Sequence, residues 1–357
     1  LSATMEKTDF SSFVGRRISG IALFDEHFGT QRNWIFRPYA NWSKKVLPNL
    51  SLEFGGGLSY YTYPNTLYFE PRLQVSYQIN ETQNLTFRSS IHSQYFLPQM
   101  FAAELVRFRK RTPELKPTKT AHTVLSYQKN LNSNTLFKAE FYHQNIFDIP
   151  IDRVVLGTWS AINYVDGTDW MTVTIPKQDQ KVSVFSSGIA TNVGLDLSLQ
   201  QFMTNGIYYL ISGSIYNSTY EDVGNVKHDS RFNGNYAFNV TAGKEFYKIK
   251  VNKTRIFGMN IRTVLAGGMR DIPFEGTRQN PNDANPFSIK MKDYFRTDFR
   301  FYLKRNRPKF TSTLALDIQN VTNRKNEAFY YYDIIKDEVL IKEQLGMIPN
   351  LSYKIQF

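Results

Sequence analysis

Apolar and polar residues alternate along much of the chain with a period of two. In the last segment, Gly346–Phe357, the polar positions are Asn350, Ser352, Lys354 and Gln356. The apolar positions between and beyond them are Leu351, Tyr353, Ile355 and Phe357. A period of two is that of a β-strand with one apolar and one polar face. Tyr294–Lys304, Val193–Gln200 and Leu73–Ile79 repeat the pattern.

These segments predict about fourteen strands, most of them long enough to cross a bilayer at a tilt. They lie near 13–25, 31–42, 50–62, 67–79, 84–95, 120–129, 135–147, 191–202, 206–219, 235–250, 255–268, 292–304, 310–320 and 345–357. No long helix is predicted, although Gln99–Phe108 could form a short one inside a loop. The predicted fold class is therefore all-β, an antiparallel transmembrane β-barrel over residues 1–357.

The connections between these strands alternate in length. The short turns are Ser43–Asn49, Asn80–Gln83, Asn130–Asn134, Met203–Asn205, Val251–Thr254 and Arg305–Lys309. The long connections are Phe96–Lys119, Asp148–Ala190, Tyr220–Gly234, Met269–Met291 and Val321–Gln344. Two outer loops, near His27–Thr30 and Tyr63–Thr66, are short exceptions. Short turns on one side and long loops on the other are typical of outer-membrane barrels, so we expect a periplasmic C-terminus and extracellular long loops.

Composition agrees with a barrel better than with a soluble enzyme. The mean hydropathy is −0.40, and no run approaches the 18 apolar residues that indicate a membrane helix. A barrel keeps its average hydropathy low because only alternate residues face lipid. The 28 Phe and 22 Tyr fit aromatic belts at the two membrane interfaces. With no cysteine, the chain has neither a disulfide framework nor a thiolate metal site.

The net charge of +12 does not by itself indicate nucleic-acid binding. Nucleic-acid-binding domains concentrate Lys and Arg on one face beside aromatic platforms. Here the basic residues stand singly between apolar ones or in turns, as do Arg72, Arg88, Arg262, Arg296 and Arg300. A basic lumen, or loops that contact anionic lipid headgroups, explains the charge better.

The sequence does not predict an enzyme, a metal site or a cofactor. The five histidines are far apart and form no HxH or HxxxH pair; they are His27, His92, His122, His143 and His228. No G-x-S-x-G segment supports a nucleophilic serine. Gly55–Gly57 and Gly267–Gly268 precede no helix, so they mark bends rather than phosphate loops. Asn280–Asn285 is read as a polar turn rather than a calcium site, and Tyr330–Tyr332 as belt residues rather than a sugar platform.

The closing strand has a second interpretation besides an ordinary edge strand. Its apolar face ends in an aromatic residue and comprises Leu351, Tyr353, Ile355 and Phe357. A terminal strand of this kind resembles the signal that the barrel-assembly machinery reads. These four residues are therefore the candidate outer-membrane assembly signal.

Several segments resemble TonB-dependent outer-membrane receptors. TPELKPTKT at Thr112–Thr120 is similar to the segment that opens a late barrel strand in that family, LDIQNVTNRKN at Leu316–Asn326 to its penultimate strand, and Gly346–Phe357 to its closing strand. Three further segments resemble the branch that carries a carboxypeptidase-regulatory-like domain: Tyr208–Tyr220, Asn233–Phe246 and Leu265–Arg270. The resemblance runs from about Phe54 to Phe357, and it implies a 22-stranded barrel around an N-terminal plug.

The resemblance implies import of a scarce nutrient, such as a metal chelate, vitamin, glycan or peptide, with energy from TonB acting through the plug. The implied partners are outer-membrane lipid, lipopolysaccharide, the barrel-assembly machinery and a surface lipoprotein. The chain starts at Leu1 without an initiator Met or signal peptide, and it shows no plug or TonB box. We therefore expect the C-terminal part of a longer receptor rather than a complete smaller barrel. A non-transporting scaffold in a larger outer-membrane complex and a small passive pore remain the alternatives.

Overall fold

One large antiparallel sheet dominates the computed structural model, which describes residues 2–18, 21–62, 65–94, 116–152, 160–163, 184–276, 278–279 and 284–357. This sheet has sixteen strands. Fourteen of them form one continuous path in the order β1-β2-β4-β5-β6-β7-β8-β9-β10-β12-β13-β18-β19-β22, while β3 pairs with β4 and β11 with β10. Among the described residues, the only helix is the 3-10 turn η1 (Ala161–Asn163), and none is long and apolar enough to cross a membrane.

The bounds of the strands follow the alternation of the sequence closely from residue 50 onward. The strands of the sheet are β1 (Ser2–Ile18), β2 (Ile21–Arg37), β3 (Tyr39–Leu47), β4 (Leu50–Tyr61), β5 (Thr66–Asn80), β6 (Gln83–Gln94), β7 (Thr118–Asn132), β8 (Thr135–Asp152), β9 (Val184–Thr204), β10 (Ile207–Glu221), β11 (Lys227–Asp229), β12 (Tyr236–Lys250), β13 (Lys253–Ala266), β18 (Tyr294–Asn306), β19 (Thr311–Gln319) and β22 (Ile348–Gln356). Three small hairpin pairs lie in the long connections. They are β14 (Arg270–Asp271) with β17 (Ile289–Lys290), β15 (Phe274–Glu275) with β16 (Arg278–Gln279), and β20 (Glu327–Asp333) with β21 (Glu338–Glu343).

The first hairpin corrects two predictions. We expected a strand near 13–25 and an outer loop at His27–Thr30, but β1 and β2 pair along their whole length and reverse between Ile18 and Ile21. His27–Thr30 lies in the middle of β2. A period of two identifies a strand but not the point where it reverses, and this hairpin reaches far beyond a membrane span.

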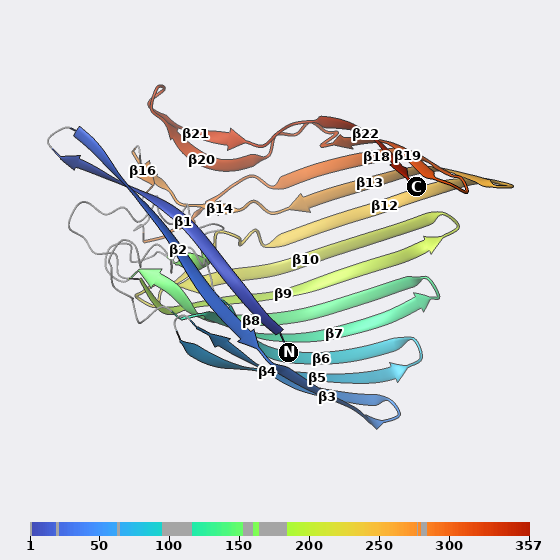
Figure 1. Cartoon of the computed structure of the whole chain (residues 1–357), viewed down its shortest axis with the longest axis horizontal. Coiled ribbons are helices and arrows are strands. Elements are labelled where there is room, and N and C mark those ends of the chain that lie inside the picture. The colour runs from blue at the N-terminus through green and yellow to red at the C-terminus, as the bar shows by residue number, and fades with distance from the viewer. Residues whose placement is uncertain are drawn as a thin grey trace.

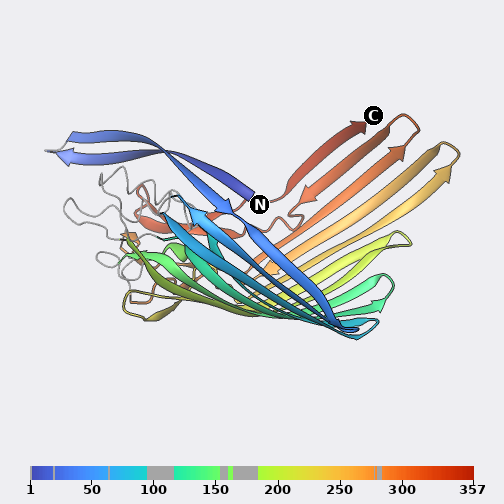
Figure 2. The ribbon, with the colours of Figure 1, turned by 60° about the horizontal axis from the view of Figure 1, so that its bottom comes forward.

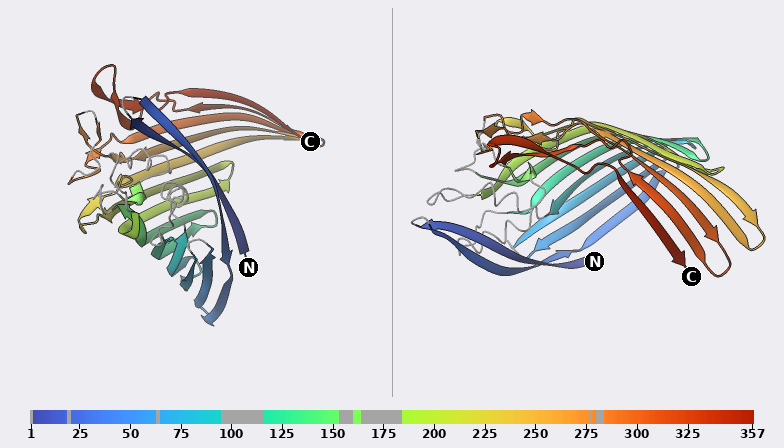
Figure 3. Two further views of the ribbon diagram at one scale, coloured as in Figure 1. Left: turned by 60° about the vertical axis from the view of Figure 1, so that its left-hand side comes forward. Right: turned by 90° about the horizontal axis from the view of Figure 1, so that it is seen from above.

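The wall strand next to β4 is made of the end of β2 followed by β3. Ile35 and Phe36 pair with β4, and Tyr39 resumes the pairing after Pro38. Proline has no amide hydrogen to donate, so the ladder breaks there, while the Pro38 carbonyl still accepts the Leu58 amide at 3.0 Å. The rest of the β1–β2 hairpin leaves the sheet and crosses the open side of the molecule (Figure 3).

The sheet curves into an open trough (Figure 2). Within the described residues, β22 pairs only with β19 and β3 only with β4, so the two edges of the wall do not meet. Every residue of β3 and of β22 is exposed. Residues 13–25 and 345–357 do not pair with each other to close a fourteen-stranded barrel, because β1 pairs with β2 and β22 with β19 instead.

Short turns lie at one end of the strands and long connections at the other, as the sequence predicts (Figure 1). The tightest turns join strands through two residues. In the turn between β9 and β10, Asn205 has φ +51° and Gly206 has φ +76°. Two positive φ values in sequence match the right-handed twist of the flanking strands, which explains the Asn-Gly pair at this position.

The two faces of the wall differ in chemistry. Register places Leu197 beside Gly213 and Ala139, and Phe301 beside Met259 and Leu316. These outward positions join into an exposed apolar band that crosses the wall. Exposed apolar surface of this extent indicates contact with lipid or with another apolar surface. The predicted lipid face of Leu195, Leu197 and Leu199, and of Phe299, Phe301 and Leu303, therefore lies on one side of the sheet.

The buried apolar residues gather at the long-loop end of the wall. A single curved sheet has no second layer to pack against, so little can be buried along its middle. Most of the buried large apolar side chains come from the ends of β2, β4, β8 and β10 and from the loop after β13: Ile35, Tyr61, Ile149, Ile151, Tyr220, Ile272, Phe287 and Met291. The loops are thus packed together as a rim, and this rim overlooks the concave face.

Candidate functional site

The concave face carries a hollow of about 590 Å³ on β7, β8, β9, β10 and β12. Its walls are polar and aromatic. The lining residues are His122, Val124, Glu140, Tyr142, Gln144, Asn192, Asp196, Ser214, Tyr216, Ser218, Phe232 and Ala237. Sequence reasoning identified none of these as site residues, since which side chains share a hollow depends on register and curvature.

Three tyrosines of the concave face lie against glycines on the neighbouring strand. Tyr142 is directly opposite Gly194, and a Cβ built on Gly194 would lie 2.5 Å from the Tyr142 hydroxyl oxygen. Tyr208 covers Gly243, and Tyr302 covers Gly258, in the same directly opposite arrangement. A larger residue at these glycines would displace the rings. The glycines therefore leave room for these aromatic rings on the concave face, and Tyr142 is the one of the three that lines the hollow.

The arginines that the sequence analysis names lie on the concave face. All five arginines named from the sequence project to the concave side, because each stands one residue away from the outward apolar positions of its strand: Arg72, Arg88, Arg262, Arg296 and Arg300. Acidic partners neutralise two of them. Arg296 Nε lies 2.7 Å from Asp298 Oδ1, and Arg300 Nη1 lies 2.8 Å from Asp317 Oδ1. The concave face thus carries charges of both signs, and some of them form ion pairs.

The rim above the hollow is tied together by contacts between different loops. Arg270, which follows β13, donates from Nε to the Asn233 carbonyl at 3.2 Å and pairs through Nη2 with Asp229 at 3.0 Å. The Arg231 amide donates to Asn163 Oδ1 at 2.9 Å, which joins the loop after β8 to the loop after β10. These loops form one connected platform around the long-loop end.

A buried histidine–carboxylate pair shapes the turn between β10 and β11. His228 Nε2 lies 2.8 Å from Asp222 Oδ2, and both side chains are nearly inaccessible. Burial of the Asp222 carboxyl opposes its ionisation, but hydrogen bonds from His228 and from the Val226 and Gly224 amides outweigh burial and lower its pKa. The carboxylate thereby holds the turn in one conformation.

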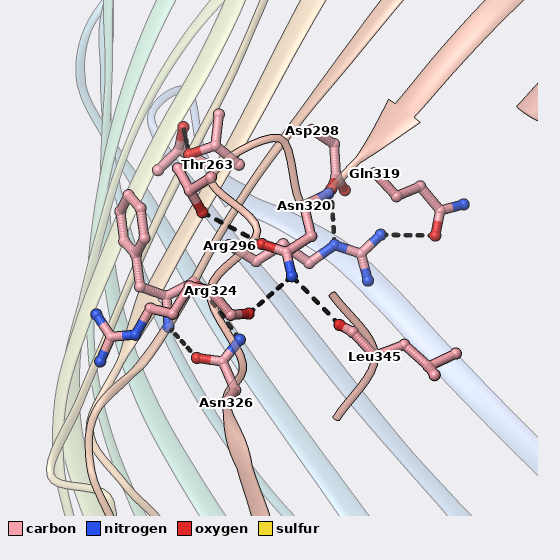
Figure 4. A network of polar contacts seen from close by, with 11 residues as sticks. Thr263, Arg296, Asp298, Gln319, Asn320, Arg324, Asn326 and Leu345 are labelled. Carbon is pink, nitrogen blue, oxygen red and sulfur yellow. Dashed lines mark hydrogen bonds and ion pairs between the residues drawn. The ribbon is translucent and has the colours of Figure 1, made fainter. Parts of the chain in front are cut away.

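The asparagines of the LDIQNVTNRKN segment, Leu316–Asn326, take part in a polar network where the chain leaves β19 (Figure 4). The Asn320 side-chain Nδ2 donates to the carbonyls of Arg324 and Leu345 at 2.8 and 3.2 Å, and the Asn320 backbone amide donates to Asp298 Oδ1 at 2.8 Å. Asn326 pairs with both backbone groups of Phe295 at 3.0 Å. These bonds fasten the start and the end of the long connection to the top of β18. The segment therefore anchors the β20–β21 hairpin, which is called the arm below.

The other predicted residues are dispersed. His122 lines the hollow, His92 bonds to Ser90 on β6, His143 lies on β8, and no group of three metal-ligating side chains occurs among the described residues. Tyr330–Tyr332 lies in β20 on the arm, and Gly55–Gly57 lies within β4. The predicted short helix at Gln99–Phe108 falls outside the described residues.

The terminal-strand residues extend the outward face. Leu351 pairs with Leu316, and Tyr353 with Leu314, so both lie on the apolar side of the wall. Ile355 follows in the same register, and Phe357 is fully exposed beyond the end of β22. Whether these residues act as an assembly signal stays a prediction.

No protein-family model and no curated protein matches the sequence. Solved structures of outer-membrane receptors do share its fold. The ferric-catecholate import receptor Fiu from Escherichia coli K12 aligns over 98% of this chain and 50% of its own, with a TM-score of 0.61 at 10% identity. The outer membrane transporter YddB from Escherichia coli gives the same coverage and TM-score at 13% identity. The ferric yersiniabactin uptake receptor FyuA from Yersinia pestis aligns over 99% of this chain and 50% of its own, with a TM-score of 0.63 at 9% identity.

The chain thus has the fold of the barrel wall of outer-membrane receptors and spans about half the length of these neighbours. This confirms the fold expected from the resemblance to TonB-dependent receptors. The names of these neighbours describe import receptors and an outer membrane transporter. The branch with a carboxypeptidase-regulatory-like domain is not tested by these similarities and stays a prediction.

Proposed function

We propose that the chain forms the C-terminal part of the barrel of an outer-membrane receptor that imports a scarce nutrient. The observation that carries the proposal is the contrast between the two faces of the sheet. The convex face is an exposed apolar band, and the concave face holds a charged, polar hollow beneath a rim of connected loops. Lipid fits the first face, and a passing polar cargo fits the second.

Energy for import would reach the receptor from TonB through a plug domain that is not among these residues. The proposal is tested by deleting the full-length gene in its native bacterium. Growth should fall under limitation for one nutrient only, among iron, a vitamin, a glycan and peptide nitrogen. The full-length gene should restore growth, and loss of TonB should reproduce the defect. Unchanged growth under all four limitations would favour the non-transporting scaffold.

The same proposal places the short turns in the periplasm and the long loops outside the cell. Ser133 in the turn after β7 and Val226 in the loop after β10 are both exposed, and residues 1–357 contain no cysteine. In the full-length receptor, Val226→Cys should react with an impermeant thiol reagent on intact cells. Ser133→Cys should react only after the outer membrane is permeabilised. The opposite labelling pattern would reverse the orientation.

We also propose that Leu351, Tyr353, Ile355 and Phe357 serve as the signal for outer-membrane assembly. The support is their continuous position on the outward face and the free end of Phe357. Phe357→Ala should lower the amount of folded, heat-modifiable receptor in the outer membrane several-fold. The free energy of unfolding of the molecules that do fold should change little. Phe246→Ala is the control, because it removes an exposed aromatic side chain on β12 toward the same short-turn end of the sheet. Equal losses in both variants would reduce Phe357 to an ordinary belt residue.

A further inference from the structure

The hollow differs in charge from the rest of the concave face. Elsewhere on the wall, Asp298 and Asp317 each contact an arginine. In the hollow, Glu140 on β8 and Asp196 on β9 stand directly opposite each other. No lysine or arginine is among the residues that line it, although the chain carries a net charge of +12. Carboxylates at directly opposite positions repel each other unless a cation lies near them.

Among the residues that the structure describes, Glu140 forms an ion pair and Asp196 does not. Lys138 Nζ lies 2.6 Å from Glu140 Oε2. The positions opposite Asp196 are Glu140 and Ser214, and neither brings a positive charge. Asp196 Oδ1 is buried and has no hydrogen-bond partner within the described part of the chain. Asp196 as a whole is half-buried and lines the hollow, so a cationic group bound beside its carboxylate would supply the charge that its neighbours do not.

The surrounding groups suit a positive charge as well. Tyr142 and Tyr216 present aromatic rings to the hollow, and aromatic faces attract ammonium and guanidinium groups. The Asn192 Nδ2 donates to Gln144 Oε1 at 3.1 Å. That bond leaves the Asn192 side-chain oxygen as a further acceptor for a donor in the hollow. The Asp196 carboxylate thus shares the hollow with a further hydrogen-bond acceptor and two aromatic rings.

We propose that this hollow binds a cationic group of the imported cargo, an ammonium or a guanidinium, through Asp196 and Glu140. The inference rests on the proposed function, because it treats the concave face as the path of a cargo. It predicts that the preferred cargo carries a positively charged group. A purely anionic cargo would meet repulsion at this point of the wall.

The test is calorimetric titration of spermidine into the full-length receptor in detergent, beside diacetylated spermidine, which keeps the length but loses two of the charges. Spermidine should bind the parent protein at least about ten-fold more tightly than the acetylated analogue. Asp196→Asn should weaken spermidine binding by about ten-fold or more, the size expected for one charge-assisted hydrogen bond. High salt should also weaken it.

Glu338→Gln is the matched control, since it removes one negative charge from the exposed β21 strand outside the hollow. Binding that is equal for the two amines, unchanged in Asp196→Asn or equally weakened in Glu338→Gln would overturn the inference. If Asp196→Asn fails to assemble, the comparison of the two amines on the parent protein decides alone. Because binding in detergent needs no energy source, a negative result here leaves the nutrient-limitation test of import unaffected.

Discussion

Leu197→Arg is expected to destabilise the folded receptor in a bilayer by about 2–4 kcal/mol. Leu197 lies on the outward face, between Ala139 on β8 and Gly213 on β10, and its side chain is 43% exposed. It stands seven residues from Thr204, the last residue of β9 before the short turn. Seven residues span roughly 23 Å of strand, or about 16 Å of depth at a tilt near 45°. An arginine there would meet the middle of the hydrocarbon layer.

The matched control is Ser212→Arg on the concave face. Ser212 is opposite Ser198 and Asn239, so an added guanidinium would meet polar side chains and water rather than lipid. It should change stability by less than about 1 kcal/mol. The measurement is urea unfolding of the full-length receptor in lipid vesicles, followed by heat-modifiability on gels. Equal costs at both positions would show that the convex face is not the lipid face.

The sequence predicted the wall well because its signal is local. In β9 and β18, every second residue is apolar over many positions, and the register of the sheet aligns those positions across neighbouring strands. The alternation of short turns and long loops also indicated in which direction each strand crosses the wall. For the β1–β2 hairpin the same signal misplaced the reversal, because the two arms pair with each other over seventeen residues each, beyond the wall.

The site was harder to predict because its residues are joined only by register and curvature. Asp196 and Glu140 are separated by more than fifty positions in sequence, and only the pairing of β8 with β9 places them opposite each other. The alternation puts Arg296, Asp298 and Arg300 on one polar face of a strand, but it does not show which charges pair. The ion pairs of Arg296 with Asp298 and of Arg300 with Asp317 required the structure. The asparagines of Leu316–Asn326 were recognised as a motif, but their role as carbonyl donors required the geometry of the loop.

Residues 1–357 expressed alone behind a signal peptide are expected not to form a stable barrel. The wall has two free edges, β3 and β22, each nine residues long and fully exposed. Roughly half the residues of an edge strand direct their amide and carbonyl groups outward, and each unpaired group in hydrocarbon costs several kcal/mol. Two such edges would exceed the roughly 5–15 kcal/mol by which proteins are usually stable.

Strands that cover both edges should rescue folding, and the structure shows where one of them would lie. Ser2 pairs with Arg37, just before Tyr39 opens the free edge of β3. A strand that led into β1 would therefore run antiparallel along β3, while the opposite edge at β22 would receive the strand that closes the barrel. The full-length receptor should give a heat-modifiable band in the outer membrane, and residues 1–357 alone should give only unfolded or degraded protein. A heat-modifiable product from residues 1–357 alone would mean that the two edges pair with each other, which would favour a small passive pore or a scaffold over the transporter.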